Sequence, residues 1–496
     1  MAKDRMLKLV TVGRDMPQKR DAGERRDDFL EVYADFAREK AGEQAGRCSQ
    51  CGVPYCHVHC PTNNNIPDWL RMVAEGRLEE AYELSQATNT FPEICGRICP
   101  QDRLCEGNCV IEQAGHGTVT IGSVERFITD TAWAEGRVRP IRPAVERRES
   151  VGVIGAGPAG LACADMLRRA GVQVTVYDRH DRAGGLMTYG IPGFKLEKHV
   201  VMRRIDQLRD GGVAFMLGCE VGRTLAFDAI RSRHDAVLIA TGVYRSREIE
   251  AEGADARGIV RAIDYLTASN RKGFGDAVPA FDDGTLDAQG KRVVVIGGGD
   301  TAMDCVRTAI RQGAASVKCL YRRDRANMPG SQREVANAEE EGVEFAWLSA
   351  PLGFVGDSVR GVRVQRMRLG APDATGRRMP EPAGEEVLEE ADLVVKALGF
   401  EPEDLPRLWG VPGLEVTRWG TLRAEFGTGA TSLPGVFAAG DIVRGASLVV
   451  WAIRDGRDAA GAILGHLGQG AARDRDLAVD RRPRQGLGQG VSVPAE

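Results

Sequence analysis

The sequence holds 496 residues, of which 66 are basic and 70 acidic, so its formal net charge is −4. A chain of this length predicts roughly three domains of about 150 residues each. The balanced charge, with no basic run among aromatic residues, argues against a nucleic-acid partner. The longest apolar stretches, such as residues 448–453, fall far short of the roughly 18 residues of a membrane span. The N-terminus has no secretory pattern, so we expect a cytoplasmic protein without a membrane partner.

Hydrophobic periodicity predicts a largely helical N-terminal region. Residues 21–45 place their apolar side chains on one helical stripe, and residues 66–86 show a second helical pattern. Residues 137–150 are rich in Arg and Pro, which is typical of an extended connection between domains. After residue 468 the chain is polar and rich in Gly, Arg and Pro, without periodicity, which predicts a mobile tail.

Eight of the 12 cysteines form two groups ahead of the nucleotide motifs described below. The first group is Cys48, Cys51, Cys56 and Cys60, and the second is Cys95, Cys99, Cys105 and Cys109. Soft thiolates at loop spacing suit iron-sulfur clusters, each of which takes four ligands, and a reducing cytosol disfavours disulfides. All-cysteine zinc sites use similar spacings, but redox-inert zinc would leave no path for electrons. The pattern therefore favours two [4Fe-4S] clusters.

A glycine-rich fingerprint follows the first long apolar strand. The segment VGVIGAGPAGLACADMLRRAGVQVTVYD contains Gly155, Gly157 and Gly160 before a helix, and its second strand ends at Asp178. The first glycine permits a tight turn, the second lets the backbone approach a pyrophosphate, and the third lets the helix pack closely. The helix N-terminus attracts phosphate, and the carboxylate can accept hydrogen bonds from a ribose. Because strand, turn, helix and acid occur together, we expect a dinucleotide site rather than a plain βαβ turn.

A second fingerprint has a different strand end. It reads KRVVVIGGGDTAMDC, with Gly297, Gly299 and Ala302 at the three positions, and its second strand is followed by Arg322 and Arg323. Two guanidinium groups would pair well with a 2′-phosphate, which predicts NADPH rather than NADH. The alternative is a solvated arginine pair, since arginine is common on surfaces.

A third segment, LPGVFAAGDIV, leads from an apolar strand through Gly440 and Asp441 into a long helix. It could return the chain to the first nucleotide domain, where Asp441 would meet the polyol or pyrophosphate of a flavin. The alternative is an ordinary turn aspartate. Two similar turns, at residues 237–242 and 394–400, are where we expect the chain to leave and rejoin that domain.

Taken in order, the eight cysteines, GAGPAG, GGLMTYGIPGFKL, IGGGDTAMDC, YRRDRANMPG and FAAGDIV resemble the small (beta) subunits of bacterial NADPH-dependent glutamate synthases over residues 25–468. The chain is similar, more distantly, to the N-terminal half of dihydropyrimidine dehydrogenase and to NADPH-ferredoxin oxidoreductase subunits. The resemblance implies an α/β fold with two Rossmann-like, glutathione-reductase-like domains after a mainly helical, Cys-rich iron-sulfur domain. The implied divisions are 1–148 for the iron-sulfur domain, 149–243 and 400–470 for the FAD domain, 244–399 for an inserted NADPH domain, and 471–496 for a flexible tail.

The resemblance also implies site residues. FAD is expected at Gly155, Gly157, Gly160, Asp178, Gly185, Gly440 and Asp441, and NADPH at Gly297, Gly299, Asp300, Thr301, Arg322 and Arg323. By similarity, Cys48, Cys51 and Cys56 would share one cluster with Cys109, and Cys60 would join Cys99 and Cys105 in the other. The eighth ligand is either Cys95 or Glu125, and Cys95 is favoured because thiolate is the softer ligand.

These parts together predict an electron-transfer flavoenzyme. A flavin takes a hydride from NADPH and gives single electrons to clusters, a task that requires no acid–base side chain, so no catalytic residue is predicted. The resemblance implies a hetero-oligomer in which a large (alpha) subunit makes L-glutamate from L-glutamine and 2-oxoglutarate. One alternative is an NADPH-linked oxidoreductase subunit that delivers electrons to ferredoxin or another partner. Another is a non-catalytic module that binds zinc and nucleotide.

Overall fold

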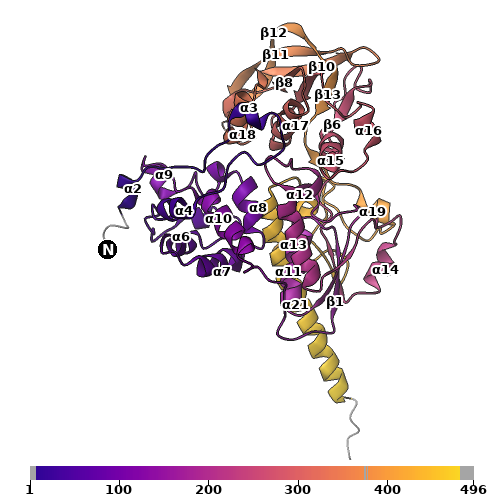
Figure 1. The fold of residues 1–496 in the computed structure, drawn as a ribbon. Helices are drawn as coiled ribbons and strands as arrows, with labels where there is room; N and C mark the ends of the chain where they lie inside the picture. The colour runs from indigo at the N-terminus through magenta and orange to yellow at the C-terminus, as the bar shows by residue number, and fades with distance from the viewer. Residues whose placement is uncertain (1–6, 374–375, 377, 481–496) are drawn as a thin grey trace, which may run out of the picture.

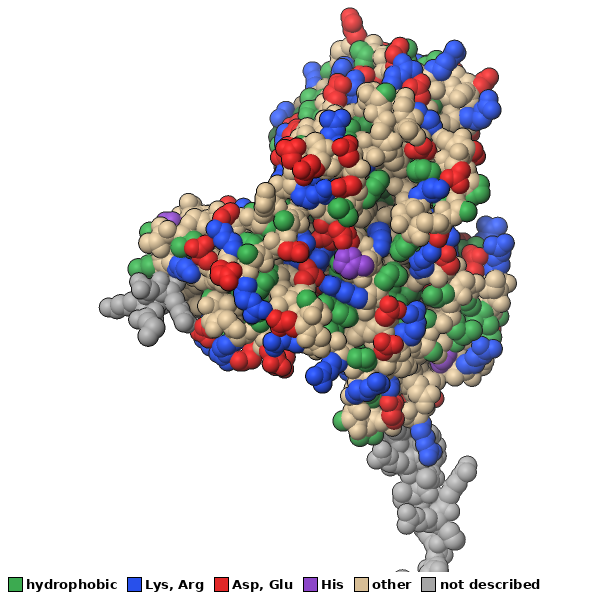
Figure 2. Space-filling model, in the orientation of Figure 1, with side chains coloured by type: hydrophobic (Ala, Val, Ile, Leu, Met, Phe, Trp, Pro, Cys, Tyr) green, Lys and Arg blue, Asp and Glu red, His purple; other side chains and the backbone are tan. Residues whose placement is uncertain are grey.

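A computed structural model of the chain describes residues 7–373, 376 and 378–480. A helical N-terminal lobe lies beside two α/β lobes, one around β1 and one around β8 and β13 (Figure 1). This arrangement confirms the predicted fold class. On the face shown in Figure 2, basic and acidic side chains are interspersed over all three lobes. Among the described helices, none combines the length and the apolar character needed to cross a bilayer.

The N-terminal lobe is built from short helices joined by tight turns. They are α2 (Lys8–Thr11), α3 (Ala22–Arg25), α4 (Arg38–Ala45), α5 (Tyr55–Val58), α6 (Ile66–Ala74), α7 (Leu78–Thr88), α8 (Pro92–Ile98), the 3-10 helix η1 (Gln101–Arg103), α9 (Val110–Gln113) and α10 (Ile121–Ala134). The helix predicted over residues 66–86 is present as α6 and α7, which are separated at Gly76, where φ is 76°.

The continuous helix predicted over residues 21–45 is wrong. Only α3 and α4 are helical, and residues 26–37 between them are irregular or extended. In this stretch the Val32 amide donates to the Phe194 carbonyl at 3.2 Å, and the Val32 carbonyl accepts from the Arg20 amide at 3.0 Å. Long-range backbone bonds therefore replace helical ones, although Val32 is still buried as its apolar character requires. We call residues 16–37 the N-terminal strap.

The first α/β lobe contains a parallel five-stranded sheet in the order β15-β4-β1-β2-β3. Residues 137–149 lead into it without regular structure, as their composition predicts. Its strands are β1 (Ser150–Ile154), β2 (Gln173–Tyr177), β3 (Ala214–Met216), β4 (Ala236–Ile239) and β15 (Val436–Ala438). Its helices are α11 (Pro158–Arg169), α12 (Leu186–Tyr189), α13 (Lys198–Asp210), α14 (Phe227–Arg231), α19 (Leu405–Trp409), α20 (Asp441–Arg444) and α21 (Val449–Asp480).

The second α/β lobe contains another parallel sheet, in the order β6-β13-β7-β8-β9. Its strands are β6 (Ile259–Arg261), β7 (Arg292–Ile296), β8 (Ser316–Tyr321), β9 (Glu344–Trp347) and β13 (Leu393–Lys396), and its helices are α15 (Ala262–Gly273), α16 (Pro279–Asp282), α17 (Asp300–Arg311), η2 (Arg325–Asn327) and α18 (Gln332–Glu340). An antiparallel sheet of β10 (Ser349–Val355), β11 (Gly361–Pro372) and β12 (Arg378–Glu390) packs beside it.

All strands of the second lobe lie between β4 and β15 in the chain, so the second lobe interrupts the first. The two crossings between the lobes pair with each other as the short antiparallel strands β5 (Arg245–Ser246) and β14 (Phe400–Glu401). At the C-terminal end, α21 runs on to Asp480, into the segment predicted as a tail. The rest of that segment, residues 481–496, lies outside the described residues.

Candidate cofactor and cluster sites

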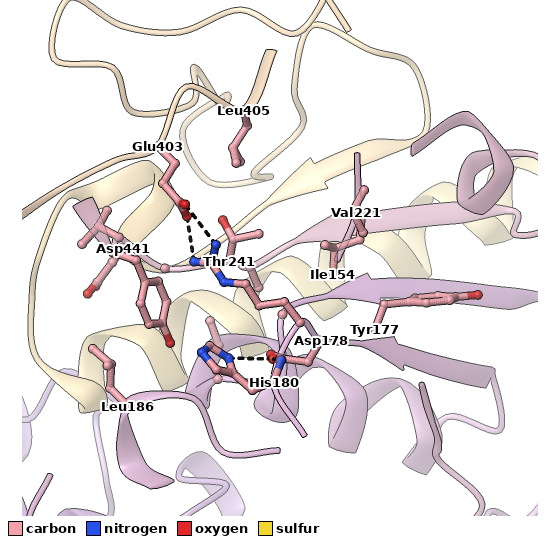
Figure 3. Close-up of a pocket in the computed structure, with 18 of the residues that line it drawn as sticks. Ile154, Tyr177, Asp178, His180, Leu186, Val221, Thr241, Glu403, Leu405 and Asp441 are labelled. Carbon is pink, nitrogen blue, oxygen red and sulfur yellow. Dashed lines mark hydrogen bonds and ion pairs between the residues drawn. The ribbon is translucent and has the colours of Figure 1, made fainter. Parts of the chain in front are cut away.

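A cavity of about 320 Å³ lies at the carboxyl end of the first sheet (Figure 3). Both halves of the interrupted lobe line it, because β1, β2 and β4 come from the first half and β15 with α20 and α21 from the second. Gly155, Gly157, Asp178 and Asp441 are among its lining residues. The structure therefore brings the first fingerprint and the turn of the FAAGDIV segment before α20 to one site.

Two glycines of the first fingerprint allow the backbone to pack closely, and the third leaves open space in front of a helix. Gly155 has a φ of 110°, and a Cβ there would lie 2.3 Å from the Ala240 carbonyl oxygen. A Cβ at Gly160 would lie 2.0 Å from the Gly155 carbonyl oxygen, so α11 can pack on the turn only with glycine. At Gly157, the residue before α11, a Cβ would meet nothing within 4 Å. That free space at a helix N-terminus fits a pyrophosphate.

Two further predicted glycines lie close to this turn. A Cβ at Gly185 would lie 2.9 Å from the Gly157 Cα, and a Cβ at Gly440 would lie 2.9 Å from the Ala159 Cβ. Gly185 precedes α12, and Gly440 precedes α20. Both therefore allow later parts of the chain to approach the turn closely.

Asp178 follows β2 and organises the turn through both of its carboxylate oxygens. Its Oδ2 accepts from the Ala156 amide at 2.7 Å, and its Oδ1 accepts from the His180 amide at 2.8 Å. The His180 ring Nδ1 lies 3.0 Å from the same Oδ1 (Figure 3). The carboxylate is thus held in place at the cavity wall, at the position where we predict a ribose contact.

Asp441 lies on the opposite wall of the cavity, at the start of α20. Its Oδ1 accepts a hydrogen bond from the Ser447 hydroxyl at 2.8 Å. Burial raises the pKa of Asp441 above its ordinary value, and the Ser447 hydrogen bond opposes this shift. Of the two readings made from sequence, the position in the cavity favours a ligand contact over a plain turn aspartate.

Sequence reasoning missed an ion pair across the same cavity. The Arg179 guanidinium donates to both Glu403 oxygens at 3.0 and 2.8 Å (Figure 3). It also lies over the Tyr244 ring, 4.8 Å from the centroid. Arg179 directly follows Asp178, which was a usable signal, but Glu403 and Tyr244 come from the two interlobe crossings and carry no local motif. This pair ties the two halves of the first lobe together at the cavity.

The second fingerprint has the same geometry. A Cβ at Gly297 would lie 2.2 Å from the Ala397 carbonyl oxygen, whereas a Cβ at Gly299 would meet nothing within 4 Å. Gly299 caps α17, whose first residues are Asp300 and Thr301. The Asp300 Oδ1 accepts from the Ser331 amide at 2.9 Å, so the carboxylate holds a neighbouring loop over the turn.

The two predicted arginines lie directly after β8. Arg322 is exposed, while Arg323 is partly buried. The Nε and Nη2 of Arg323 are shielded from solvent and have no hydrogen-bond partner among the described residues. Leaving such donors unpaired is costly, so an anionic group that accepts from them would be stabilised here. These residues therefore fit the 2′-phosphate predicted from the sequence.

Four cysteines of the predicted first cluster come together. Cys48, Cys51, Cys56 and Cys109 line one small cavity in the N-terminal lobe, and all 12 cysteines are free thiols. Burial raises the pKa of Cys48 to about 11 and of Cys56 to about 12, and neighbouring thiolates add to both shifts. Buried thiols release their protons when a metal compensates the charge. The fold is therefore compatible with Cys109 sharing one cluster with Cys48, Cys51 and Cys56.

Cys60, Cys95, Cys99 and Cys105 lie within electrostatic reach of one another. A hydrogen bond with Cys95, followed by burial, raises the pKa of Cys99, and burial with repulsion from Cys60 raises that of Cys105. In the described part of the chain, no three His, Cys, Asp or Glu side chains are arranged to hold a single metal ion. A cubane surrounds four irons, so its four ligands stand further apart than those of one ion.

Both candidates for the eighth ligand lie at this second site. The Glu125 Oε1, on α10, accepts from the side-chain amides of Asn64 and Asn89, each at 3.3 Å. Burial raises the pKa of Glu125 to about 8. The Cys95 thiol lies 3.8 Å from the Asn89 Oδ1 and is buried. Two amides already hold the carboxylate, which supports Cys95 as the ligand.

Comparisons with known proteins agree with this geometry. Residues 25–137 match the family model described as dihydropyrimidine dehydrogenase domain II, 4Fe-4S cluster, and residues 149–456 match that of the pyridine nucleotide-disulphide oxidoreductases. The structure is similar in fold to Mycobacterium tuberculosis FprA in complex with NADPH, with a TM-score of 0.56 and 21% identity over 67% of this chain and 89% of that one.

Two relatives match over nearly the whole length. The glutamate synthase [NADPH] small chain of Azospirillum brasilense is 66% identical over 93% of this chain and 96% of its own length. The small chain of Escherichia coli K12 is 47% identical over 93% of this chain and 99% of its own. These identities show that the chain belongs to the family of glutamate synthase [NADPH] small chains, which are oxidoreductases.

Proposed function

We propose that the chain is the electron-input subunit of glutamate synthase. It binds NADPH at the second fingerprint and FAD in the large cavity, and it holds two [4Fe-4S] clusters in the N-terminal lobe. From there electrons pass to a large subunit that makes L-glutamate from L-glutamine and 2-oxoglutarate. Four sites, one for each nucleotide and one for each cluster, lie in one chain of this family.

The observation that carries the proposal is the position of the second cysteine group. Of the cysteines assigned to the second cluster, Cys95 and Cys99 belong to the same buried core as Met187, which lines the cavity of the first lobe. Cys105 belongs to the N-terminal lobe's own core together with Cys56 and Cys109, and Cys60 packs against that core. The second cluster site therefore spans the two cores, which supports a route from FAD through this cluster toward the first one.

The chain's own residues prepare each site for its cofactor. The amides at the start of α11 and α17 face open space at Gly157 and Gly299 and can receive phosphates. The Arg179–Glu403 pair closes the FAD cavity across its two halves. When bound, FAD supplies two-electron hydride acceptance from NADPH and one-electron donation to clusters.

Anaerobic purification together with the large subunit tests this proposal. The chain should carry one FAD and about eight irons with equal acid-labile sulfide, as two [4Fe-4S] clusters require. NADPH oxidation should depend on L-glutamine and 2-oxoglutarate only in the complex. Zinc in place of iron would instead support the non-catalytic module, and turnover with ferredoxin but not with the large subunit would support the alternative acceptor.

A further inference from the structure

Two loops from different lobes meet beside the second cysteine group. The cluster loop, residues 99–103, follows α8 and includes η1, and the nucleotide loop, residues 329–333, includes the first two residues of α18. The Arg333 Nη1 donates to the Gln101 Oε1 at 2.8 Å, and its Nη2 donates to the Cys99 carbonyl oxygen at 3.4 Å. Two further hydrogen bonds lie alongside: the Ser331 hydroxyl donates to the Asp102 carboxylate at 3.4 Å, and the Arg103 guanidinium donates to the Pro329 carbonyl oxygen at 2.5 Å.

The same nucleotide loop also holds the second glycine turn. The Gly330 amide donates to the Gly298 carbonyl oxygen at 3.0 Å, and the Ser331 amide donates to the Asp300 carboxylate at 2.9 Å. A single short loop therefore contacts both the turn that fits the NADPH phosphates and the loop that carries Cys99.

Arg333 supplies a guanidinium to this contact, which also contains the charged side chains of Asp102 and Arg103, and its Nε lies 4.0 Å from the Glu334 Oε1. Its side chain is only 29% exposed, while Gln101, which receives its hydrogen bond, is 2% exposed. The Gln101 Nε2 donates to the Cys95 carbonyl oxygen at 3.3 Å. The guanidinium is thus connected to the backbone at both Cys95 and Cys99, and arginine keeps its charge at every pH of interest.

We propose that Arg333 is a positioning residue for electron transfer. It fixes the nucleotide loop against the cluster loop, and its charge raises the reduction potential of the cluster held by Cys60, Cys95, Cys99 and Cys105. An added electron makes a cluster more negative, so a nearby cation stabilises the reduced form, and outer partners of this kind tune potentials. The inference rests on the proposed function, because it requires the cluster.

The test compares R333Q and R333K with R261Q in the full, cluster-loaded chain. Arg261 lies in the same lobe and is exposed, and among the described residues its side chain pairs with the nearby Asp264 at 2.7 Å, so it controls for the loss of one positive charge. Two quantities are measured. One is the midpoint potential of the clusters, monitored by electron paramagnetic resonance during photochemical reduction, and the other is the dissociation constant for NADP⁺.

R333Q should make reduction of one cluster about tenfold less favourable, which is about 59 mV for a one-electron couple. It should also weaken NADP⁺ binding by about tenfold, because the loop loses its charged anchor. R333K should restore the potential but not the NADP⁺ affinity, since an ammonium group cannot span the two acceptors as the planar fork does.

Equal potentials and equal NADP⁺ affinities in R333Q and R261Q would overturn the inference. If R333Q loads no iron, the R333K variant tests the inference instead. An NADP⁺ affinity of R333K equal to that of R261Q would contradict the anchoring role. Absence of iron from the wild-type chain would instead refute the proposed function, and this result is distinguishable from equal potentials and affinities in iron-loaded variants.

Discussion

We expect selection of NADPH over NADH to depend on Arg322 and Arg323. Replacing either one with glutamine should raise the dissociation constant for NADPH by about ten- to a hundredfold, because each charge-assisted hydrogen bond to the 2′-phosphate contributes about 1.5–3 kcal/mol. Binding of NADH should change little. Arg325→Gln is the matched control, since Arg325 lies in the same loop but pairs with Glu339 at 2.7 Å. An unchanged NADPH affinity in these variants would show that the arginines are merely solvated.

The eighth cluster ligand can be identified by two single substitutions. Cys95→Ser should remove one cluster, which halves the iron content, because a serine is a poor soft ligand. Glu125→Gln should keep both clusters, since its amide would still occupy the place between Asn64 and Asn89. Iron analysis with absorption spectroscopy measures both outcomes. If Glu125→Gln loses half of the iron while Cys95→Ser keeps it, the carboxylate is the ligand.

Residues with local signals were predictable, and residues joined across the chain were not. The glycines and cysteines could be identified by their spacing, because a turn or a cluster needs several of them within a short stretch. The Arg179–Glu403 and Arg333–Gln101 contacts join segments that only the tertiary fold brings together. Apart from the position of Arg179 next to Asp178, nothing in the local sequence distinguishes these arginines from solvated ones.

Among the elements, α21 packs on α11 through a glycine. A Cβ at Gly456 would lie 2.1 Å from the Ala159 carbonyl oxygen, beside the FAD cavity. Gly456→Ala should therefore lower the free energy of unfolding by about 1–3 kcal/mol, as overpacking does, and reduce FAD retention. Thermal unfolding and FAD content after gel filtration measure the two effects.

Gly461→Ala provides the control for this helix, because a Cβ there would meet nothing within 4 Å. Since alanine favours helix over glycine by about 1 kcal/mol, the control should be neutral or more stable. Equal behaviour of the two variants would show that the close approach of α21 to α11 is unimportant.

Element prediction failed where long-range contacts outweigh periodicity. Residues 26–37 follow the predicted helical pattern, but their backbone pairs with Phe194 and with residues 18–20 instead. The strands and helices around both fingerprints, in contrast, follow the sequence closely, because each is a compact βαβ unit whose apolar runs pack locally. The continuation of α21 beyond residue 470 has no such apolar signal in the sequence.

At the scale of the whole molecule, the N-terminal strap joins the iron-sulfur lobe to the second α/β lobe, and α3 lies beside α18 in Figure 1. Arg25, 1% exposed, pairs with Glu341, 0% exposed, at 3.1 Å and with Glu340 at 2.7 Å. Glu341 also pairs with Arg307 at 2.8 Å. This buried network fixes the lobe that fits NADPH relative to the cysteine groups.

Arg25→Gln should lower the free energy of unfolding by about 1.5–3 kcal/mol, the contribution of hydrogen bonds to charged groups. Hydrogen exchange should also quicken in the strap and in α18. Arg20→Gln serves as the control, because Arg20 pairs with Asp28 inside the strap only. Faster exchange in the control alone would contradict a role of the strap in joining the lobes.

The central claim is that NADPH electrons cross this chain through the cysteine groups to a partner, and Cys109→Ser in the complex with the large subunit tests it most directly. Glutamine-dependent NADPH oxidation is the quantity to measure, with the FAD content and assembly of the variant verified first. We predict that NADPH still reduces the flavin while coupled glutamate formation falls to background. Unchanged coupled turnover in a variant that lacks the first cluster would contradict the account.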